Sequence, residues 1–484
     1  MSYIEIPFTQ SAEEENRYLW VRNVGTVVTC DDDDRILHGV DLFAENGVIK
    51  YIGPRAGEII DRKRNEASER GERFGPTDII DGRGMILYPG LINTHHHLYQ
   101  IFSRNLPQVQ RMELFPWLKT LYEIWKNLDG NVVYYSTLAG AGELLKTGCT
   151  TCLDHHYVFP EGHHNDLLDA QFAAADDLGI RFYATRGSMD LSVKDGGLPP
   201  DSVVQTVEEI LEDSEEAILK YHDPARFSMH RVALAPCSPF SVSRRLLAES
   251  AELARKHGVR LHTHLCETKD EEKYMLEKEG VRPLEYMKQV GWVGEDVWYA
   301  HGIWFNDEEL DFLAQTGTGV AHCPVSNMKL SSGVARVPEM LRRGVPVGLA
   351  VDGSASNDGS SLLEEMRAAY LLHRLHTGYD APSGYEILKM ATRGSARLLG
   401  RDDIGAVAEE MAADFFMIEA GKLSLVGAQS DPAALLATVG YKGDVEYTVV
   451  NGRIVVEHGK LKNIDEEAAA RRAGEIVRDY LSRE

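Results

Sequence analysis

A His-x-His pair, His95 and His97, closely follows an apolar run that begins at Met85. On a β-strand, successive side chains point to opposite faces, so these two imidazoles would share one face and His96 would point to the other. Two imidazoles on one face form half of a metal site, because a catalytic zinc takes at least three protein ligands. The chain must therefore fold so that other segments supply the missing ligands.

The central part of the chain alternates short β-branched runs with longer helical patterns, as repeated βα units do. Candidate strands cover residues 85–97, 149–156, 180–187, 231–237, 259–266, 297–302, 319–324 and 345–352. These eight units predict an α/β protein with a (β/α)8 TIM-like barrel, whose active site lies at the carboxyl ends of its strands. Helical patterns at residues 385–399 and 466–483 are expected to close the barrel and to cap the chain.

Hairpin patterns stand near both ends of the chain. Asn46-Gly47 joins two apolar runs in the N-terminal part, and Asn451-Gly452 does the same in the C-terminal part. Each hairpin is too small to bury a face alone, so we expect both to pair into one small β-sandwich. The predicted domains are residues 1–86, the N-terminal part of the sandwich, residues 87–404, the catalytic barrel, and residues 405–484, the rest of the sandwich with a terminal helix.

The composition restricts the partners. A net charge of −24 disfavours binding to nucleic acid or to an anionic membrane, and favours a small neutral or cationic ligand. No apolar run approaches the ~20 residues of a membrane span, and Met1–Glu5 lacks the features of a secretory signal, so we expect a cytoplasmic protein. The six cysteines are expected to be buried thiols. Homo-oligomer formation stays open.

Candidate metal ligands stand at the ends of three further predicted strands. His264 lies near the end of the fifth strand and is followed by Glu267, His301 ends the sixth, and Asp352 ends the eighth. One such residue alone is more often a hydrogen-bonded core residue than a ligand. Their joint placement at barrel strand ends predicts that they meet the His-x-His pair in one site.

Other histidines and one serine motif have simpler interpretations. His262 and His322 could serve as ligands, but packing roles are favoured because the ligand set is complete without them. Packing or solvated positions are expected for His96, His155, His156, His163 and His164. The Ser326-x-x-Lys329 spacing matches a motif of penicillin-binding enzymes but lacks its partner motifs, so we interpret it as coincidence.

The order of these residues resembles the amidohydrolase superfamily: His-x-His, then His with Glu three residues later, then His, then Asp before Gly-Ser-Ala-Ser-Asn. The resemblance covers nearly the whole chain and is greatest to the branch of purine, pterin and s-triazine aminohydrolases. It implies one divalent metal, which we expect to be zinc, held by His95, His97, His264 and Asp352. It also implies catalytic roles for Glu267, His301 and Asp352.

The residue chemistry supports hydrolysis independently. Three neutral imidazoles and one carboxylate leave a net positive metal centre, which lowers the pKa of a bound water toward ~7. Asp352 can take the proton from that water, Glu267 can carry protons to a ring nitrogen and to the departing amine, and His301 would orient the water or stabilise charge. Binuclear members of the superfamily bridge their metals with a carboxylated lysine or a carboxylate. Because residues 231–239 contain no Lys, Asp or Glu, we expect a single metal.

Loops after the predicted strands resemble those of superfamily members that deaminate 8-oxoguanine, notably residues 93–100, 113–120, 154–160 and 235–240. The resemblance implies hydrolysis of 8-oxoguanine to urate and ammonia. Isoxanthopterin, isocytosine and hydroxylated s-triazines are the alternative substrates, and a non-catalytic scaffold is the alternative from another class. Cys266 stands beside the metal ligands where the family pattern has a small residue such as Ala.

A flat oxidised purine needs polar groups for its carbonyl edges and an aromatic or apolar floor. The polar contacts are expected from Gln100, Tyr157, Arg186 and Ser238. The floor is expected from Trp117 and Trp304. An Arg or Trp on such a loop is equally suited to a structural clamp.

Overall fold

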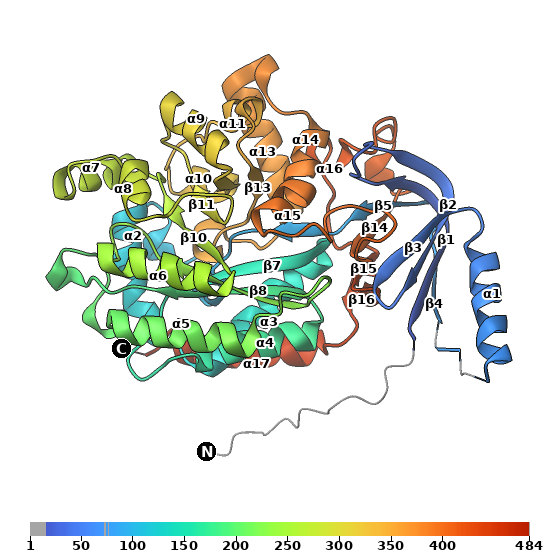
Figure 1. Ribbon diagram of the computed structural model, residues 1–484, viewed down its shortest axis with the longest axis horizontal. Helices are drawn as coiled ribbons and strands as arrows, with labels where there is room; N and C mark the ends of the chain where they lie inside the picture. The colour runs from blue at the N-terminus through green and yellow to red at the C-terminus, as the bar shows by residue number, and fades with distance from the viewer. Residues whose placement is uncertain (1–15, 72–73, 76, 484) are drawn as a thin grey trace.

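The computed structural model describes residues 16–71, 74–75 and 77–483, so Met1–Glu5 lies outside the described residues. Two sheets organise the chain (Figure 1). An eight-stranded sheet wrapped by helices forms one end of the molecule, and a nine-stranded mixed sheet lies at the other. Among the described residues, no helix combines the length and the apolar character needed to cross a membrane.

The eight-stranded sheet is parallel, and each strand pairs with the next along the chain. Its strands are β6 (Leu91–Asn93), β7 (Cys149–His156), β8 (Arg181–Ser188), β9 (His230–Pro236), β10 (Arg260–Leu265), β11 (Val297–His301), β12 (Gly319–His322) and β13 (Val347–Leu349). The first and last strands meet where Thr94 Oγ1 donates to the carbonyl of Leu349 at 3.1 Å and Asp352 N donates to the carbonyl of His95 at 3.1 Å. The predicted (β/α)8 barrel is confirmed.

Helices follow the barrel strands and cover the sheet. They are α2 (Leu114–Trp125), α3 (Gly130–Lys146), α4 (Asp166–Leu178), α5 (Val207–Tyr221), α6 (Arg244–His257), α7 (Lys269–Lys278), α8 (Pro283–Gln289), α9 (Asp307–Thr316), α10 (Pro324–Lys329), α11 (Val337–Arg343), α12 (Ser354–Asn357) and α13 (Leu362–Thr377). The pattern at residues 385–399 forms α14 (Gly384–Lys389) and α15 (Ser395–Leu398), joined by a π-helical turn.

Helix α6 illustrates how the sequence sets these elements. Ser243 begins it by accepting a hydrogen bond from Leu246 N at 3.1 Å, and Gly258 ends it in the left-handed conformation (φ 67°). Leu246, Ala251 and Ala254 lie on its buried face. This spacing repeats at about 3.6 residues per turn, so the helix packs one stripe against the barrel and exposes the rest.

Strands from both parts of the chain build the mixed sheet, as expected for the two hairpins. They are β1 (Tyr18–Val28), β2 (Ile36–Glu45), β3 (Val48–Gly53), β4 (Thr77–Asp81), β5 (Met85–Pro89), β14 (Phe415–Glu419), β15 (Tyr447–Val450), β16 (Arg453–Glu457) and β17 (Lys460–Leu461). β14 pairs antiparallel with β5, which joins the two hairpin regions into one hydrogen-bonded sheet. Asn46 and Asn451 have left-handed φ angles of 51° and 48°, as Asn-Gly hairpin turns require. Helix α1 (Ala56–Glu69) packs against β1, β2 and β3 of this sheet, whereas α16 (Leu435–Thr438) packs against α13 and α14.

The chain passes from the mixed sheet into the barrel at Gly90. The single strand predicted at residues 85–97 is wrong, because β5 belongs to the mixed sheet, β6 belongs to the barrel, and His95–His97 lie beyond the end of β6. A Cβ added at Gly90 would lie 2.0 Å from Thr150 Oγ1, so the close approach of β7 requires glycine here. The division into domains stays a prediction, and its boundary at residues 86–87 falls within β5.

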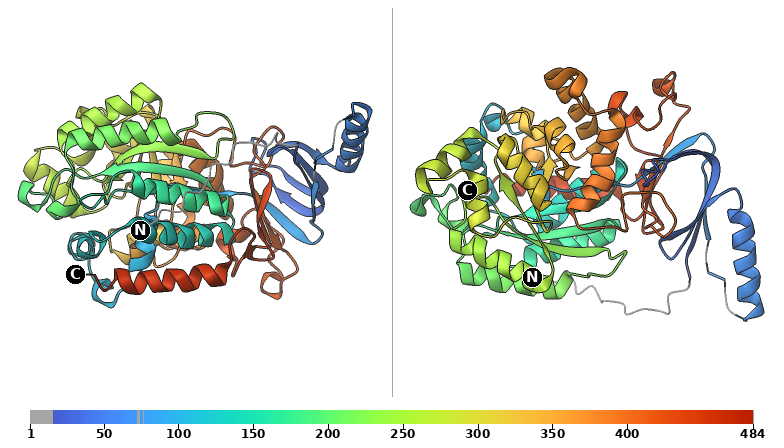
Figure 2. Two further views of the ribbon diagram at one scale, coloured as in Figure 1. Left: turned by 90° about the horizontal axis from the view of Figure 1, so that it is seen from below. Right: turned by 45° about the horizontal axis from the view of Figure 1, so that its top comes forward.

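The terminal helix α17 (Glu466–Tyr480) covers the barrel. It runs along α3 (Figure 2) and buries Ile476 and Tyr480 in a hydrophobic cluster with Trp125. Asp465 begins the helix by accepting a hydrogen bond from Ala468 N at 3.0 Å. The last described segment therefore returns from the mixed sheet to stabilise the barrel's outer surface.

Candidate active site

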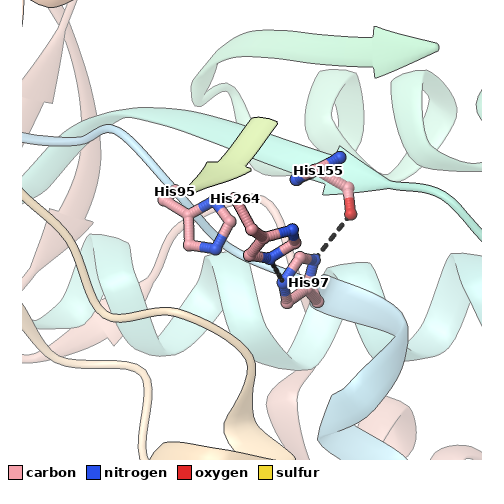
Figure 3. Close-up of side chains that lie close together, drawn as sticks. All are labelled: His95, His97, His155 and His264. Atoms are coloured by element: carbon pink, nitrogen blue, oxygen red, sulfur yellow. Dashed lines mark hydrogen bonds between the residues drawn. The ribbon is translucent and has the colours of Figure 1, made fainter. Parts of the chain in front are cut away.

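Five histidines and one aspartate converge at the carboxyl end of the barrel. Their candidate ligand atoms form two overlapping groups, each within 4.8 Å, namely His95, His264, His301 and Asp352, and His95, His97, His155 and His264. Figure 3 shows the second group, in which the rings of His97 and His264 point toward each other. The structure therefore brings together the metal-binding residues that the sequence predicts.

The distances between these donor atoms are short. Nε2 of His95 and Nε2 of His97 each lie 3.2 Å from Oδ1 of Asp352, and Nε2 of His97 lies 3.1 Å from Nε2 of His264. Burial lowers the pKa of His95 and of His264 well below its ordinary value, so both rings are neutral. Nε2 of His95 has no hydrogen-bond partner among the described residues. Neutral nitrogens gathered around a carboxylate oxygen fit a divalent cation.

Hydrogen bonds fix the orientation of the three histidines. His95 Nδ1 lies 2.7 Å from Nε2 of His262, whose own Nδ1 lies 3.0 Å from the carbonyl of Trp298. That carbonyl can only accept, and burial lowers the pKa of His262 to about 3, so neutral His262 accepts a hydrogen bond from His95. His97 and His264 donate through Nδ1 to the carbonyls of residues 155 and 237, at 2.7 and 2.6 Å. All three rings thus present Nε2 to the site.

Asp352 is held through both carboxylate oxygens. Its Oδ2 accepts hydrogen bonds from Ser326 Oγ at 2.6 Å and Ser356 Oγ at 3.2 Å, while Oδ1 accepts from Gly353 N at 2.7 Å. Burial alone would raise the pKa of Asp352, but its close contacts with the neighbouring histidines, His95 first, hold it well below its usual range. An ionised carboxylate follows, which suits both metal binding and proton acceptance.

Glu267 and His301 form a second pair beside this cluster. Nε2 of His301 lies 3.6 Å from Oε2 of Glu267 and 4.0 Å from Oδ2 of Asp352. Burial raises the pKa of Glu267, and Ser332 Oγ donates to Glu267 Oε1 at 3.1 Å. Burial would lower the pKa of His301, but the charges of Glu267 and Asp352 raise it. Glu267 and His301 can therefore each hold a proton, and both lie beside the candidate metal ligands.

Three positions around the site have left-handed backbone. Cys266, His301 and Asp352 have φ angles of 55°, 72° and 62°. Cys266 is only 2% exposed and joins the main hydrophobic cluster, while its carbonyl accepts hydrogen bonds from Ile303 N and Trp304 N at 2.9 and 3.0 Å. The departure from the family pattern at Cys266 is therefore a packing feature of the turn before Glu267.

A largely apolar pocket opens onto these residues. Its walls include Leu114, Trp117 and Leu118 of α2, together with Phe240 and Leu330. Gln100 and Tyr157 line the same pocket. Gln100 Oε1 and Trp117 Nε1 are buried without a hydrogen-bond partner in the described structure. One acceptor and one donor beside the cluster are thus available to a ligand.

The other three predicted substrate contacts lie outside the pocket lining of the described residues. Arg186 is buried, donates to Gln205 and Asp213 at 2.7 and 2.8 Å, and stacks over Phe159. Ser238 Oγ bonds Ser241 Oγ at 2.8 Å. Trp304 Nε1 donates to the carbonyl of Ser332 at 3.0 Å, on the loop that also reaches Glu267. These three side chains are engaged as structural clamps.

Sequence reasoning missed several residues that touch the site. Ser326 and Ser356 hold Asp352, and Asn327 Oδ1 accepts from His301 Nδ1 at 2.8 Å. Ser326 and Asn327 closely follow the seventh predicted strand, and this position at a barrel strand end could have indicated their place in the site. Lys329 instead pairs with Asp358 at 2.5 Å, which agrees with reading the Ser-x-x-Lys spacing as coincidence.

The histidines that were expected to be packing or solvated residues differ in their surroundings. His155 and His156 lie on β7 and are fully buried, so a solvated position is wrong for both, and His155 belongs to the candidate ligand groups. His96 Nε2 bonds Ser360 Oγ at 2.8 Å, away from the cluster, as expected for a packing residue. His163 and His164 pair with Asp166 and Asp213 near the surface.

Comparisons with known proteins agree with this site. The amidohydrolase family profile matches residues 86–455. The chain is 42% identical over 446 residues to 8-oxoguanine deaminase of Pseudomonas aeruginosa, which covers 92% of this chain and 95% of that protein. It is 40% identical over 460 residues to hydroxydechloroatrazine ethylaminohydrolase of Pseudomonas sp. (strain ADP), with 94% of each protein covered.

A solved structure shows the same architecture. Atrazine chlorohydrolase from Arthrobacter aurescens TC1, complexed with zinc, matches with a TM-score of 0.88 at 33% identity, covering 95% of this chain and 100% of that chain. The family match, the full-length relatives and the histidine-rich site all describe a metal-dependent hydrolase that acts on C–N bonds. The chain therefore belongs to the amidohydrolase family.

Proposed function

We propose that this enzyme is a zinc-dependent hydrolytic deaminase that converts 8-oxoguanine to urate and ammonia. The observation that carries the reaction type is the meeting of His95, His97 and Asp352 donor atoms, 3.2 Å apart, beside the Glu267–His301 pair. The 42% identity to 8-oxoguanine deaminase of Pseudomonas aeruginosa supports the choice of substrate.

One zinc ion per chain is the proposed cofactor, held by His95, His97, His264 and Asp352. The orphaned Nε2 of His95 and the neutral imidazoles support this donor set. When bound, zinc supplies the Lewis acidity that makes water a nucleophile near neutral pH. β9 carries no Lys, Asp or Glu, so no residue on that strand could bridge a second ion.

The chain's own residues move the protons. Asp352, ionised and with Oδ2 turned toward His301, accepts a proton from the attacking water. The raised pKa of Glu267 favours its protonated form, which can donate its proton to a ring nitrogen of the substrate. The ionised Glu267 can then take the second proton of the added water and pass it to the departing amine, and the proton held by Asp352 restores Glu267. His301 donates through Nδ1 to Asn327, so its Nε2 faces the reacting centre and can stabilise charge there.

We assign substrate recognition to the uncharged side chains that line the active-site pocket. Gln100 Oε1 and Trp117 Nε1 offer an unpartnered acceptor and donor, and the Tyr157 ring lies 5.0 Å from the ring of His97. Arg186 is neutralised by Asp213 and lies outside the pocket lining of the described residues. An uncharged heterocycle therefore suits this pocket better than an anionic one, since no described arginine or lysine lines it.

Release of the departing amine from a panel of purines, pterins, pyrimidines and triazines tests the substrate, measured as ammonia or, for N-alkylated triazines, as the alkylamine. We expect 8-oxoguanine to have the highest kcat/KM in this panel. Turnover of another ring, with 8-oxoguanine untouched, would overturn the substrate assignment. Metal analysis of the same preparation should give one zinc per chain, and two tightly held ions would overturn the single-metal proposal.

Hydroxylated s-triazines are the second candidate substrates. The 40% identity to hydroxydechloroatrazine ethylaminohydrolase and the TM-score of 0.88 to a triazine-hydrolysing enzyme favour them. A 32% identical isoxanthopterin deaminase keeps pterins in the panel, and isocytosine tests the pyrimidines. The discriminating result is the ratio of kcat/KM values, because all these reactions would use the same catalytic residues.

A further inference from the structure

Glu271, on the first turn of α7, lies close to the active site without lining it. Its side chain is fully buried. Oε1 accepts a hydrogen bond from Cys266 N at 2.9 Å, and Oε2 accepts one from Glu267 N at 2.9 Å. One carboxylate thus clamps two successive backbone amides, and the second amide belongs to the residue proposed to move protons.

This clamp differs from the ordinary role of a glutamate at that helical position. Thr268-x-x-Glu271 has the sequence of a capping box, in which Glu returns a hydrogen bond to the backbone N–H of the first residue. Helices α5, α9 and α14 form that reciprocal pair, through Glu209, Glu309 and Glu386. In α7, Thr268 accepts from Glu271 N at 3.3 Å, but the carboxylate bonds the two preceding amides instead.

The clamped amides flank a strained turn. Cys266 has a φ of 55°, a left-handed conformation that residues with a Cβ atom rarely adopt. The next residue, Glu267, must direct its carboxylate to within 3.6 Å of His301 Nε2 and 3.1 Å of Ser332 Oγ. Fixing both amides fixes the position of the Glu267 Cα atom, from which its side chain starts, since the peptide units on either side of Cys266 can no longer rotate.

A buried carboxylate is costly, so its retention needs a reason. Burial raises the pKa of Glu271 to about 7, and no lysine or arginine is among the causes of that shift. Two amide donors, the N-terminus of α7 and the nearby charge of His301 stabilise its ionised form. A glutamine or glutamate pointing to Thr268 N would cap α7 without this desolvation cost.

We propose that Glu271 is a positioning residue that aims Glu267 for proton transfer by clamping the amides of Cys266 and Glu267. The inference rests on the proposed role of Glu267 as the proton carrier. It assigns to Glu271 no contact with the substrate or the metal. Its effect on turnover is therefore expected to pass entirely through Glu267.

The isosteric variant Glu271→Gln tests the clamp. Gln keeps one acceptor oxygen but turns an NH2 group toward the other amide, so one of the two hydrogen bonds is lost. We expect kcat to fall by about tenfold to a hundredfold, because a small misplacement of a catalytic group costs that much, while KM and zinc content stay unchanged. The matched control Glu209→Gln should leave kcat unchanged, since Gln also serves in a capping box.

A double-mutant cycle separates positioning from general damage. In a Glu267→Gln background, adding Glu271→Gln should lower kcat no further, because the residue being aimed is already inactive. Losses that multiply in the double variant would overturn the proposal, and so would loss of zinc in Glu271→Gln. In Glu271→Asp, whose shorter side chain reaches one amide, one of the two hydrogen bonds is also lost, so kcat should fall by a similar factor.

Hydrogen exchange supplies a readout that does not depend on the substrate. The amides of Cys266 and Glu267 should exchange faster in Glu271→Gln, while amides in the middle of β10 stay unchanged. Unchanged exchange at these two amides overturns the clamp whichever heterocycle the enzyme uses. A panel without any turnover would instead overturn the proposed function and leave the exchange result to decide the clamp.

Discussion

His262 supports the metal site although it belongs to neither candidate ligand group. His262 accepts a hydrogen bond from His95 Nδ1 and donates one to the carbonyl of Trp298. These two bonds fix the tautomer of His95, although His262 itself does not reach the metal site. Sequence position alone could not reveal this, because His262 and His264 share a strand face and either could have been the ligand. Only the distances place His264 among the candidate ligands and His262 behind His95.

Replacing His262 should weaken the metal site. In His262→Ala, His95 Nδ1 loses its acceptor, and removal of such a partner typically costs about tenfold to a hundredfold in metal affinity. Competition with a chelator measures the zinc dissociation constant. His96→Asn is the matched control and should keep wild-type affinity, because His96 bonds Ser360 on the other side of the chain. Equal affinities in both variants would contradict the relay through His262.

Replacing Glu267 should separate binding from catalysis. Glu267→Gln cannot carry a proton, so turnover should fall by about a hundredfold to ten-thousandfold. Zinc content should stay at the wild-type value, because Glu267 belongs to neither group of candidate ligand atoms. Steady-state kinetics and metal analysis on the same sample check both parts. Near wild-type turnover would rule out Glu267 as the proton carrier.

At the scale of elements, the strand pattern could be predicted and one strand boundary could not. Periodicity located the barrel strands because each is a short apolar run between helices. It failed at residues 85–97, since an apolar run reads the same whether it belongs to one sheet or to two. Ser326 and Ser356 were missed for a related reason: they meet at Asp352 from two different loops, and no spacing in the sequence reports such a meeting.

The crossing at Gly90 gives a test of this element boundary. In Gly90→Ala, the new Cβ would clash with Thr150 Oγ1 at 2.0 Å and Cγ2 at 2.4 Å, so β7 must shift. Overpacking of this kind costs about 1–3 kcal/mol of unfolding free energy. Urea unfolding measures it. Gly130→Ala is the control, because its Cβ meets no atom within 4 Å, and equal stabilities of the two variants would contradict the close crossing.

At the scale of the whole molecule, a buried ion pair joins the barrel to the mixed sheet. Arg181 of β8 donates to both oxygens of Asp414, each at 2.9 Å, directly before β14. Asp414 also accepts a hydrogen bond from Asn451 N at 2.7 Å. The pairing of the two chain ends in one sheet could be predicted from their hairpins, but this long-range ion pair could not, because nothing in the sequence links residues 181 and 414.

A second buried pair, Arg401–Asp403, predicts a pH dependence of stability. Burial would raise the pKa of Asp403, but hydrogen bonds and the charge of Arg401 lower it to about 2. The unfolded pKa is about 3.9, so this pair contributes about 2 kcal/mol above that pH and loses it as the pH falls toward 2.

Unfolding of Asp403→Asn at several pH values tests this. The difference from wild type should be largest near pH 6 and should shrink by about 2 kcal/mol as the pH approaches 2. Asp402→Asn, at the exposed neighbouring position, is the control and should track wild type throughout. A difference that does not change with pH would show that Asp403 acts through its neutral contacts alone.

The left-handed backbone at Cys266, His301 and Asp352 has a consequence for how such a sequence changes over time. Each of these positions would be relieved by glycine, and in part by asparagine, so substitutions there can stabilise the apo fold while removing the chemistry. Selection for thermal stability alone would therefore favour the replacement of these active-site residues. At His301 and Asp352 the backbone conformation that lowers stability is the one that holds the side chains proposed to act, so stability and turnover oppose each other there.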